Sequence, residues 1–379
     1  MTNVIELSKR LINIPSITPK GNACIDVLVS LLQPLGFTIE KFNYGDATNL
    51  WARYGEASPL LCLLGHVDVV PIGPREKWQH DPFAAVIEND MLYGRGASDM
   101  KTGVAAMITA ATAFVQQKPH FNGSIAFLIT TAEEDMHELG VPNVVEILKK
   151  RNEKIDYCIT GEPSSQTITG DTIRNGRRGS LGAKLTVHGK QGHVAFPHLA
   201  DNPLHKAFAA FDELTRIEWD RGNDDFPPTS FQFTNLHSGT GANNIIPGDV
   251  VCHFNFRFSP EVSAETLTKK TTTVLEKHAL NYDVEWNLSG FPFFTAKDRL
   301  TTIASNAVQT LTGTTPQFST GGGTSDARFI APLGAQVIEL GVTNKTAHQI
   351  DECETIENIR LLPRIYLHIL HQLFNHRHI

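Results

Sequence analysis

Short apolar segments alternate with helix-like segments through the first half of this chain, and this alternation constrains the fold more than any other feature. The apolar segments show no period of two, which is typical of strands covered on both faces. Strands of this kind joined by helices are typical of a largely parallel sheet. The expected helices cover 3–14, 24–35, 102–117 and 141–150, and the expected strands cover 48–54, 60–67, 123–132 and 154–160. The sequence therefore predicts an α/β fold with a mostly parallel sheet sandwiched by helices.

The pattern changes after the stretch GRRGS at 176–180. The segment LGAKLTVHGK alternates between apolar and polar residues, as a half-exposed strand does, and a helical pattern follows over 203–216. Two further strands, a helix near 263–279 and a final strand complete a β-α-β-β-α-β order, which is typical of a ferredoxin-like α+β domain. We therefore expect an inserted domain at 179–292, within a catalytic domain made of 1–178 and 293–379.

Composition and charge exclude several classes of protein. The 379 residues carry a net charge of −7 and no long basic run, which argues against nucleic acid as a partner. No apolar stretch approaches the roughly 18 residues of a membrane span, and the N-terminus does not resemble a signal peptide. The five cysteines are scattered without a CxxC pair and favour reduced thiols in a cytoplasmic protein. Histidines 368, 371, 376 and 378 are irregularly spaced and predict a solvated tail.

Histidine and carboxylate residues stand where the apolar strands end. In open parallel sheets ligands bind at the carboxyl ends of strands. Five successive positions of this kind, at strand ends or directly before a helix, carry His66 with Asp68, Asp99, Glu133 with Glu134, Glu162, and His348. Each has an ordinary alternative, since a lone histidine is usually structural, Asp99 could cap the next helix, and the glutamate pair could be a solvated turn. Their coincidence favours a site for divalent ions such as zinc.

The same residues are numerous enough for two metal ions, provided that one carboxylate bridges them. If 65–69 is extended, His66 and Asp68 project to the same face. The Asp68 carboxylate could then accept the second ring N–H of a ligating His66, although a simple turn cap is the alternative.

Several motifs, in order along nearly the whole chain, resemble those of the co-catalytic zinc amidohydrolase and exopeptidase family. That family includes acetylornithine deacetylase, aminoacylases and glutamate carboxypeptidases. The motifs are GHVDVVP, KWQHDPF followed by LYGRGASDMKTG, TTAEED, TGEPSS, and GGGTSDARF followed by NKTAHQIDE.

The resemblance implies a zinc-peptidase-like domain with two Zn²⁺ per subunit, for which Co²⁺ or Mn²⁺ can substitute. Asp99 would bridge the ions and precede a cis peptide bond. One ion would also be held by His66 and Glu162, and the other by Glu134 and His348. Glu133 would act as the general base, with Asp68 in support of His66.

The resemblance also implies a homodimer formed through the inserted domain. His193 would reach the active site of the partner subunit and donate to the oxyanion of the intermediate. Asn243 and Asn244 resemble further contacts across the dimer.

The resemblance further implies that the substrate is a small N-acyl-amino-acid amide rich in carboxylates. Arginine binds carboxylates in a bidentate manner, so several guanidinium groups should surround such a substrate. The candidates are Arg177, Arg178, Arg257 and Arg328, and short polar contacts could come from Gly323, Thr324, Ser325 and Asn344. Solvation at the surface is the alternative for each arginine, least so for Arg257 in its apolar strand.

Three other interpretations stay open or are disfavoured. A family member with another acyl-amino-acid substrate would show the same motifs. A metal-storage protein without catalysis would not require Glu133 beside the ligands. A serine hydrolase is disfavoured, because the chain contains no G-x-S-x-G elbow.

Overall fold

The computed structural model describes residues 3–374, and within them the chain forms two compact units. The first unit comprises the chain up to Gly176, Phe294–Ser319 and the chain from Ser325 onward. The second comprises Arg177–Phe293 and Thr320–Thr324. Each unit has its own cluster of buried hydrophobic side chains, so each has an independent core.

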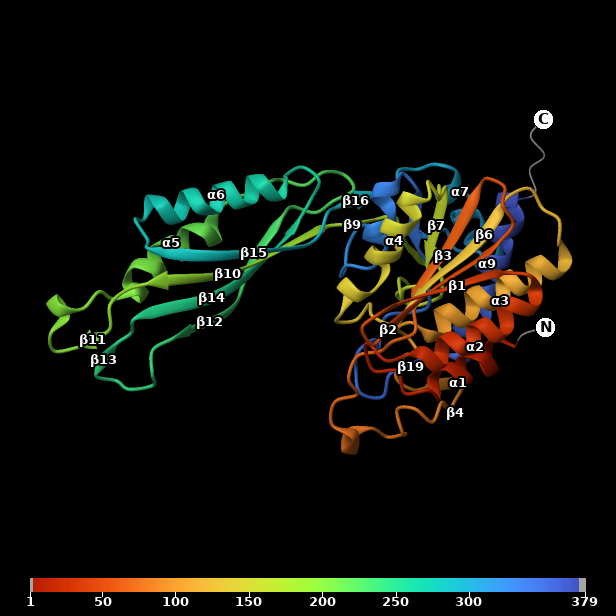
Figure 1. Ribbon diagram of the computed structural model, residues 1–379, viewed down its shortest axis with the longest axis horizontal. Helices are drawn as coiled ribbons and strands as arrows, with labels where there is room; N and C mark the ends of the chain where they lie inside the picture. Colours follow the sequence, from red (N-terminus) through yellow and green to blue (C-terminus); the bar gives the residue numbers. More distant parts are fainter. Residues whose placement is uncertain (1–2, 375–379) are drawn as a thin grey trace. The chain divides into compact units, whose positions relative to one another are not determined.

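The first unit is built on an eight-stranded sheet (Figure 1). Its four central strands, β6, β3, β7 and β18, are all parallel to one another. In order across the sheet the strands are β1 (Thr38–Tyr44), β2 (Ala47–Tyr54), β6 (Ser124–Thr130), β3 (Leu60–His66), β7 (Tyr157–Thr160), β18 (Gln336–Glu339), β8 (Thr172–Arg174) and β17 (Gln317–Ser319). The predicted mostly parallel α/β sheet is confirmed.

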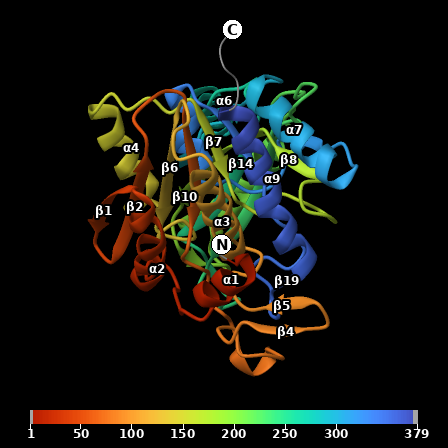
Figure 2. The same ribbon diagram turned by 90° about the vertical axis from the view of Figure 1, so that its right-hand side faces the viewer.

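Helices cover both faces of this sheet. One layer contains α1 (Val4–Ile12), α2 (Asn22–Leu32), α3 (Lys101–Gln117), α7 (Arg299–Thr312) and α9 (Ile356–Phe374). Within it α3 packs against α1 and α9. Figure 2 shows α3 and α9 in front of the sheet, and Figure 1 shows α4 (Val141–Lys150) on the other side of it from these two helices. Helix α8 (Ala327–Ile330) contacts α4. Residues 125, 127 and 129 of β6 face the large core shared with α3, which leaves the alternate positions for the α4 side.

The longer elements predicted for this unit agree closely with the observed ones, but strand β1 and the three-residue strands β4 (Val86–Glu88), β5 (Met91–Tyr93), β8, β17 and β19 (Cys353–Thr355) were not predicted. Helices α3 and α4 begin and end within one residue of the expected ranges. Strand β1 was not predicted, because it is a half-exposed edge strand with only a weak apolar pattern. It forms an antiparallel hairpin with β2, and β2 also pairs antiparallel with β6. A small sheet of β19, β5 and β4 lies apart from the main one.

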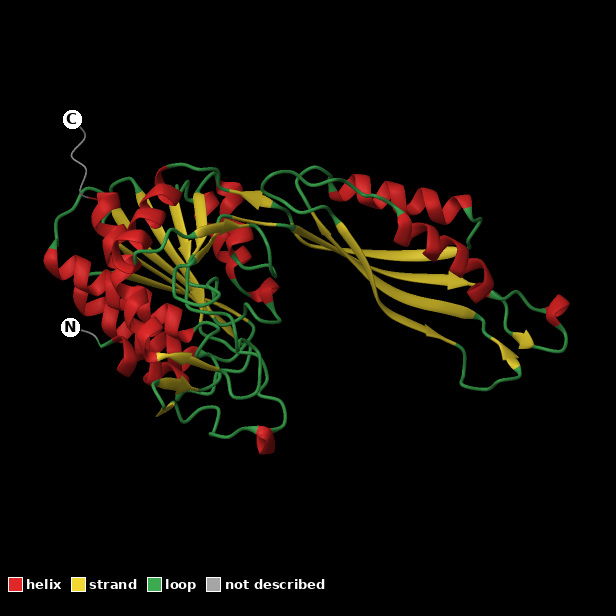
Figure 3. Ribbon diagram, turned by 180° about the vertical axis from the view of Figure 1, so that it is seen from behind, coloured by secondary structure: helices red, strands yellow, loops and turns green. Residues whose placement is uncertain are grey.

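The second unit contains a four-stranded antiparallel sheet in the order β12-β14-β10-β15. Its main elements are β10 (Gly179–His188), α5 (Pro203–Arg216), β12 (Ser230–Ser238), β14 (Asp249–Phe258), α6 (Ala264–Lys277) and β15 (Tyr282–Gly290). Figure 3 shows both helices on the same face of the sheet. This order and connectivity are those of the predicted ferredoxin-like domain. Short strands β11 (Gly192–His193) and β13 (Ile245–Ile246) pair with each other, and β9 (Gly176–Arg177) and β16 (Phe293–Phe294) lie where the chain passes between units.

The second unit also contains residues 320–324, which the sequence analysis placed in the catalytic domain. Two hydrogen bonds give the reason. Arg177 donates from Nη1 to the carbonyl oxygen of Gly321, and the Thr320 hydroxyl donates to the carbonyl oxygen of Asp225. These bonds tie the Gly-rich segment to the inserted part of the chain.

No helix within residues 3–374 is both long enough and apolar enough to span a bilayer.

Candidate metal centre

The carboxyl ends of the central strands of the first unit are aligned with one another. His66, the last residue of β3, pairs in register with Thr130, the last residue of β6. Thr160 ends β7 and lies opposite Leu64 of β3 and Glu339 of β18. The residues that follow these ends must therefore leave the sheet at the same edge. This alignment brings the predicted histidines and carboxylates together.

Asp99 lies at the centre of the group, and its two carboxylate oxygens face different histidines. Oδ1 is 3.2 Å from Nε2 of His66, and Oδ2 is 3.3 Å from Nε2 of His348. The peptide bond between Asp99 and Met100 is cis, as the family resemblance implies. A carboxylate placed between two separate imidazoles in this way can bridge two cations.

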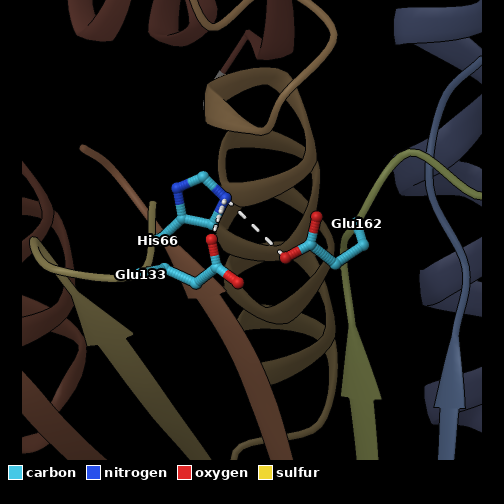
Figure 4. Close-up of side chains that lie close together, drawn as sticks. All are labelled: His66, Glu133 and Glu162. Carbon is cyan, nitrogen blue, oxygen red and sulfur yellow. Dashed lines mark ion pairs between the residues drawn. The ribbon is translucent and has the colours of Figure 1, made fainter. Parts of the chain in front are cut away.

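Each histidine also has a glutamate of its own. Glu162 Oε1 lies 3.7 Å from Nε2 of His66, and Figure 4 shows the two side chains directed toward each other from neighbouring strands. Glu134 Oε2 lies 3.1 Å from Nε2 of His348. Two groups of three donors result, one around His66 and one around His348, and they share Asp99.

Glu133 is close to the same centre but outside these two triads. Its Oε2 is 3.9 Å from Nε2 of His66 (Figure 4), and the His66, Glu133 and Glu162 donors could by distance alone hold an ion together. The donors of His66, Asp99 and Glu134 are equally close. The geometry therefore brings both adjacent glutamates to the site, and chemistry must distinguish their roles.

Asp68 contributes differently from its expected role. The Nδ1 of His66 contacts the backbone carbonyl of Asp68 at 3.0 Å, while the nearest carboxylate oxygen is 3.6 Å away. The carboxylate instead accepts the backbone N–H groups of Glu133 and Glu134, at 3.3 and 3.1 Å. Asp68 lies two residues beyond the end of β3, where its carboxylate meets the turn after β6 instead of the imidazole. Asp68 fixes the turn that carries the two glutamates.

The protonation equilibria show how strongly this site favours positive charge. Burial raises the pKa of Glu133 well above its usual value, and nearby carboxylates, including Glu134 and Asp99, raise it further. Hydrogen bonds to Asp99 and Glu134 raise the pKa of His348 to about 10. Although burial opposes it, hydrogen bonds from both histidines lower the pKa of Asp99. These shifts arise because several carboxylates and two histidines are held close together, an arrangement that favours added positive charge.

The donor set fits a pair of divalent metals. Two imidazoles and three carboxylates form the two triads, and nitrogen and oxygen donors of this kind suit zinc and similar ions. Three protein ligands per ion leave a coordination position open, as catalytic zinc sites require. Glu133 is then the surplus carboxylate beside the pair.

Asp326 is a neighbouring carboxylate that the sequence analysis did not single out. It is 3% exposed, and neither of its carboxylate oxygens has a hydrogen-bond partner among the described residues. Burial raises its pKa to about 6, against the opposing effects of Arg328 and His66. It lies in the TSDARF motif, but an aspartate before a short helix resembles an ordinary cap, so no local pattern indicates that this acid is buried.

The other residues predicted in the first unit lie in the same part of the fold but are engaged with their neighbours. The Ser325 hydroxyl donates to the carboxylate of Glu339. Arg328 is buried, donates from Nη1 to the carbonyl of Ser325, and lies over the ring of Phe329. Asn344 donates its backbone N–H to the carbonyl of Ser165, which anchors the start of the loop to His348. These contacts hold the segments in place whether or not a substrate also uses them.

The remaining predicted residues belong to the second unit and are not part of the cluster in the first. His193 lies in β11 with an exposed side chain whose Nδ1 accepts the N–H of Ala195. Arg257 lies on β14 and lines a groove on the sheet. Arg177, Arg178, Asn243, Asn244, Gly323 and Thr324 are in this unit as well. Of the C-terminal histidines, His371 packs against Phe114 rather than lying in solvent, and His376 and His378 lie outside the described residues.

The chain is similar to known proteins over nearly its whole length. Residues 62–372 match the model of peptidase family M20/M25/M40. A succinyl-diaminopimelate desuccinylase of Hydrogenovibrio crunogenus is 51% identical over 98% of both chains, and one of Acinetobacter baylyi is 50% identical over 98% of this chain and 99% of the relative.

Solved structures show the same fold at low identity. A metallo-carboxypeptidase of the M20 family from Sulfolobus solfataricus aligns with a TM-score of 0.80 at 18% identity, over 98% of this chain and 99% of the other. A dinuclear metal-binding M20 peptidase of Bacillus subtilis aligns with a TM-score of 0.75 at 15% identity, over 98% of both chains.

Proposed function

The chain belongs to peptidase family M20/M25/M40, and from that premise we propose that it is a dinuclear metal amidohydrolase of small acyl-amino acids. It is a succinyl-diaminopimelate desuccinylase by its full-length likeness to relatives of that name. It hydrolyses the amide of N-succinyl-LL-2,6-diaminopimelate to succinate and LL-2,6-diaminopimelate. This reaction supplies precursors for lysine and peptidoglycan. The single observation that carries the metal proposal is Asp99, whose two oxygens face two different histidines.

In the proposed site, Asp99 would be shared by two Zn²⁺ ions, for which Co²⁺ or Mn²⁺ could substitute. His66 and Glu162 complete one site, and His348 and Glu134 complete the other. When bound, such ions lower the pKa of an attacking water and polarise the amide carbonyl.

The protein supplies the proton transfer. Glu133 accepts the proton of the attacking water and passes it to the departing amine. Its position outside the two triads leaves its carboxylate available for this step. Asp68 holds the backbone of both glutamates, so that one can be a ligand while its neighbour stays free.

The second unit is proposed to supply substrate recognition and the dimer contact. The substrate carries three carboxylates, which suit the guanidinium groups of Arg177, Arg178 and Arg257, together with Arg328 of the first unit. Large apolar side chains are exposed on the second unit, which supports a protein contact there. They include Val194, Phe196, Leu199, Phe208 and Leu236. In a homodimer, His193 of the partner subunit would donate to the oxyanion. A biosynthetic enzyme of this kind is expected in the cytoplasm.

Metal removal and substrate comparison test the proposal together. Chelation should abolish activity, and titration with Zn²⁺ or Co²⁺ should restore it as the content approaches two ions per chain. The restored enzyme should have a higher kcat/KM for N-succinyl-LL-2,6-diaminopimelate than for N-acetylornithine. A higher value for N-acetylornithine would identify a different amidohydrolase of the family, and full activity without metal would contradict the proposed mechanism.

A further inference from the structure

A buried ion pair lies beside the candidate metal centre but contributes no ligand to it. Nη1 of Arg95 is 2.9 Å from Oε2 of Glu352, and the two side chains are 2% and 0% exposed. Removing two charges from water is costly, and replacing such a pair with apolar residues is often neutral or stabilising. Stability alone is therefore a weak reason for this pair, and its further contacts indicate another.

Glu352 holds the backbone that presents Asp99. Its Oε1 accepts the N–H groups of Ser98 and Asp99 at 2.8 and 2.9 Å. Its Oε2 accepts the N–H of Gly96 at 3.0 Å in addition to the Arg95 guanidinium. Helix α3 begins only at Lys101, so no regular element fixes residues 96–99. The Glu352 carboxylate takes over that function by binding three of their N–H groups.

Arg95 connects the loops that carry the two histidines. Its Nη1 also donates to the carbonyl oxygen of Gln349, the residue after His348, at 3.0 Å. Its Nη2 donates to the carbonyl oxygen of Pro71, in the loop that follows His66, at 3.2 Å. The ring of Trp78 covers the guanidinium at 5.0 Å. One buried pair therefore contacts the loops of His66, Asp99 and His348.

The loop of His348 needs such a support more than the others. His348 has φ +62°, in the left-handed region that is unfavourable for a side chain with a Cβ atom. It is also half exposed and lies outside any strand or helix. A fixed contact at the neighbouring Gln349 limits how far this ligand can move away from Asp99.

We infer that Arg95 and Glu352 are positioning residues of the metal centre. The pair holds three loops at the spacing that lets one oxygen of Asp99 face His66 and the other face His348. This inference rests on the proposed dinuclear site, since without metal the spacing would have no chemical consequence.

Glu352→Gln tests the inference, and Glu354→Gln is its matched control. Glu354 is also buried and also accepts four hydrogen bonds, from the N–H and hydroxyl of Thr343, the N–H of Thr355 and the amide of Asn358. None of those donors is in 96–99. Both substitutions place an amide NH₂ opposite existing donors, so both should lower thermal stability. Only E352Q should disturb Asp99.

The metal-free full-length variants are titrated with Co²⁺. Calorimetry measures the binding affinity, and visible absorption reports the environment of the bound ion. Loss of a residue that orients a ligand typically weakens metal binding roughly 10–100-fold. We expect that loss in E352Q with an altered Co²⁺ spectrum, and wild-type affinities and spectrum in E354Q. Unchanged affinities in E352Q, or an equal loss in E354Q, would overturn the inference.

If E352Q does not fold, Arg95→Lys provides a second test of the inference. Lysine keeps the charge beside Glu352 but lacks the fork that reaches Gln349 and Pro71 together. We expect a smaller but measurable loss of Co²⁺ affinity, and unchanged binding in R95K would again overturn the inference. Failure of the proposed function looks different, because the wild-type protein itself would then bind fewer than two Co²⁺ per chain.

Discussion

The two units of this chain carry their charged groups at different places on their sheets. In the first unit they lie at one edge of the sheet, and in the second they lie on one face. In the first, helices cover both faces of a mostly parallel sheet, and the charges gather at the carboxyl ends of the strands. In the second, α5 and α6 cover one face of an antiparallel sheet, and a groove with polar lining lies on the sheet. Arg257, Lys184, His253, Asn255 and Asn287 line that groove.

This difference separates two kinds of chemistry. In the first unit, the residues that follow the aligned strand ends leave the sheet at one edge, which brings several carboxylates close together. A single-layered sheet can instead present basic and polar side chains for a carboxylate-rich ligand. We therefore propose that the first unit holds the metals and the general base and that the second supplies most of the substrate recognition, and the following predictions test that division.

The largest effect is expected for Glu133→Ala. Removing a general base typically costs roughly 10²–10⁴-fold in kcat. Metal content should stay at the wild-type value, because Glu133 lies outside the two triads. Glu134→Ala is the matched comparison and should lose metal as well as activity, which steady-state kinetics and metal analysis would detect. Loss of metal in E133A with retention in E134A would reverse the two roles.

The next effect concerns the independence of the two cores. Phe256 is fully buried in the second core, against Trp219 and Phe231. Truncating such a ring to alanine costs about 3–5 kcal/mol. Phe256→Ala should lower the unfolding temperature of the second unit without changing metal stoichiometry. Phe127→Ala, in the first core, should weaken metal binding. Calorimetric unfolding of both variants, with and without metal, makes the comparison. Metal loss in F256A would show that the units are not independent.

A third prediction concerns Asp326 and pH in the metal-free protein. Its folded pKa of about 6 lies above the value of 3.8 for an unperturbed aspartate, so the folded state binds the proton more tightly. Stability from this group is therefore present below pH 3.8 and is lost as pH rises through 6. Asp326→Asn should remove that loss. At pH values above 6, the free energy of unfolding of the variant should exceed that of the wild type by up to about 3 kcal/mol. Denaturant titrations at several pH values measure the free energy of unfolding of both proteins. If this free energy changed with pH equally in both, the raised pKa of Asp326 would be contradicted.

The smallest effect is expected for Arg257→Ala in the second unit. A hydrogen bond to a charged group contributes about 1.5–3 kcal/mol, so kcat/KM should fall roughly 10–100-fold. Metal content should not change. Lys184→Ala removes another cation that lines the same groove, one paired at the surface with Glu285, and it should have little effect. Equal losses in R257A and K184A would indicate a general charge effect rather than recognition by Arg257.

The predictions agree best with the structure where the sequence signal is local, and least where a contact joins distant residues. Helices α3, α4 and α5 were predicted to within a residue, because their apolar periodicity is local and strong. Edge strand β1 was missed, because half-exposed strands carry little apolar signal. The hydrogen bonds of Asp68 differed from expectation, since its partners are backbone N–H groups 65 and 66 residues away. Arg95, Asp326 and Glu352 were missed because nothing in their neighbouring residues shows that they are buried.

The sequence by itself determined the fold class and the residue types at the strand ends. It did so because a parallel α/β sheet brings the carboxyl ends of its strands to one edge, independently of the conformation of the loops. The sequence motifs, through their resemblance to a known family, also implied that Asp99 lies between two histidines, as the structure shows. Only the tertiary structure decided that Asp68 holds the backbone of the glutamate pair and that Arg95 and Glu352 join three loops. These contacts depend on loop paths across more than two hundred residues of separation in the case of Arg95 and Glu352. No local pattern of side chains encodes such paths.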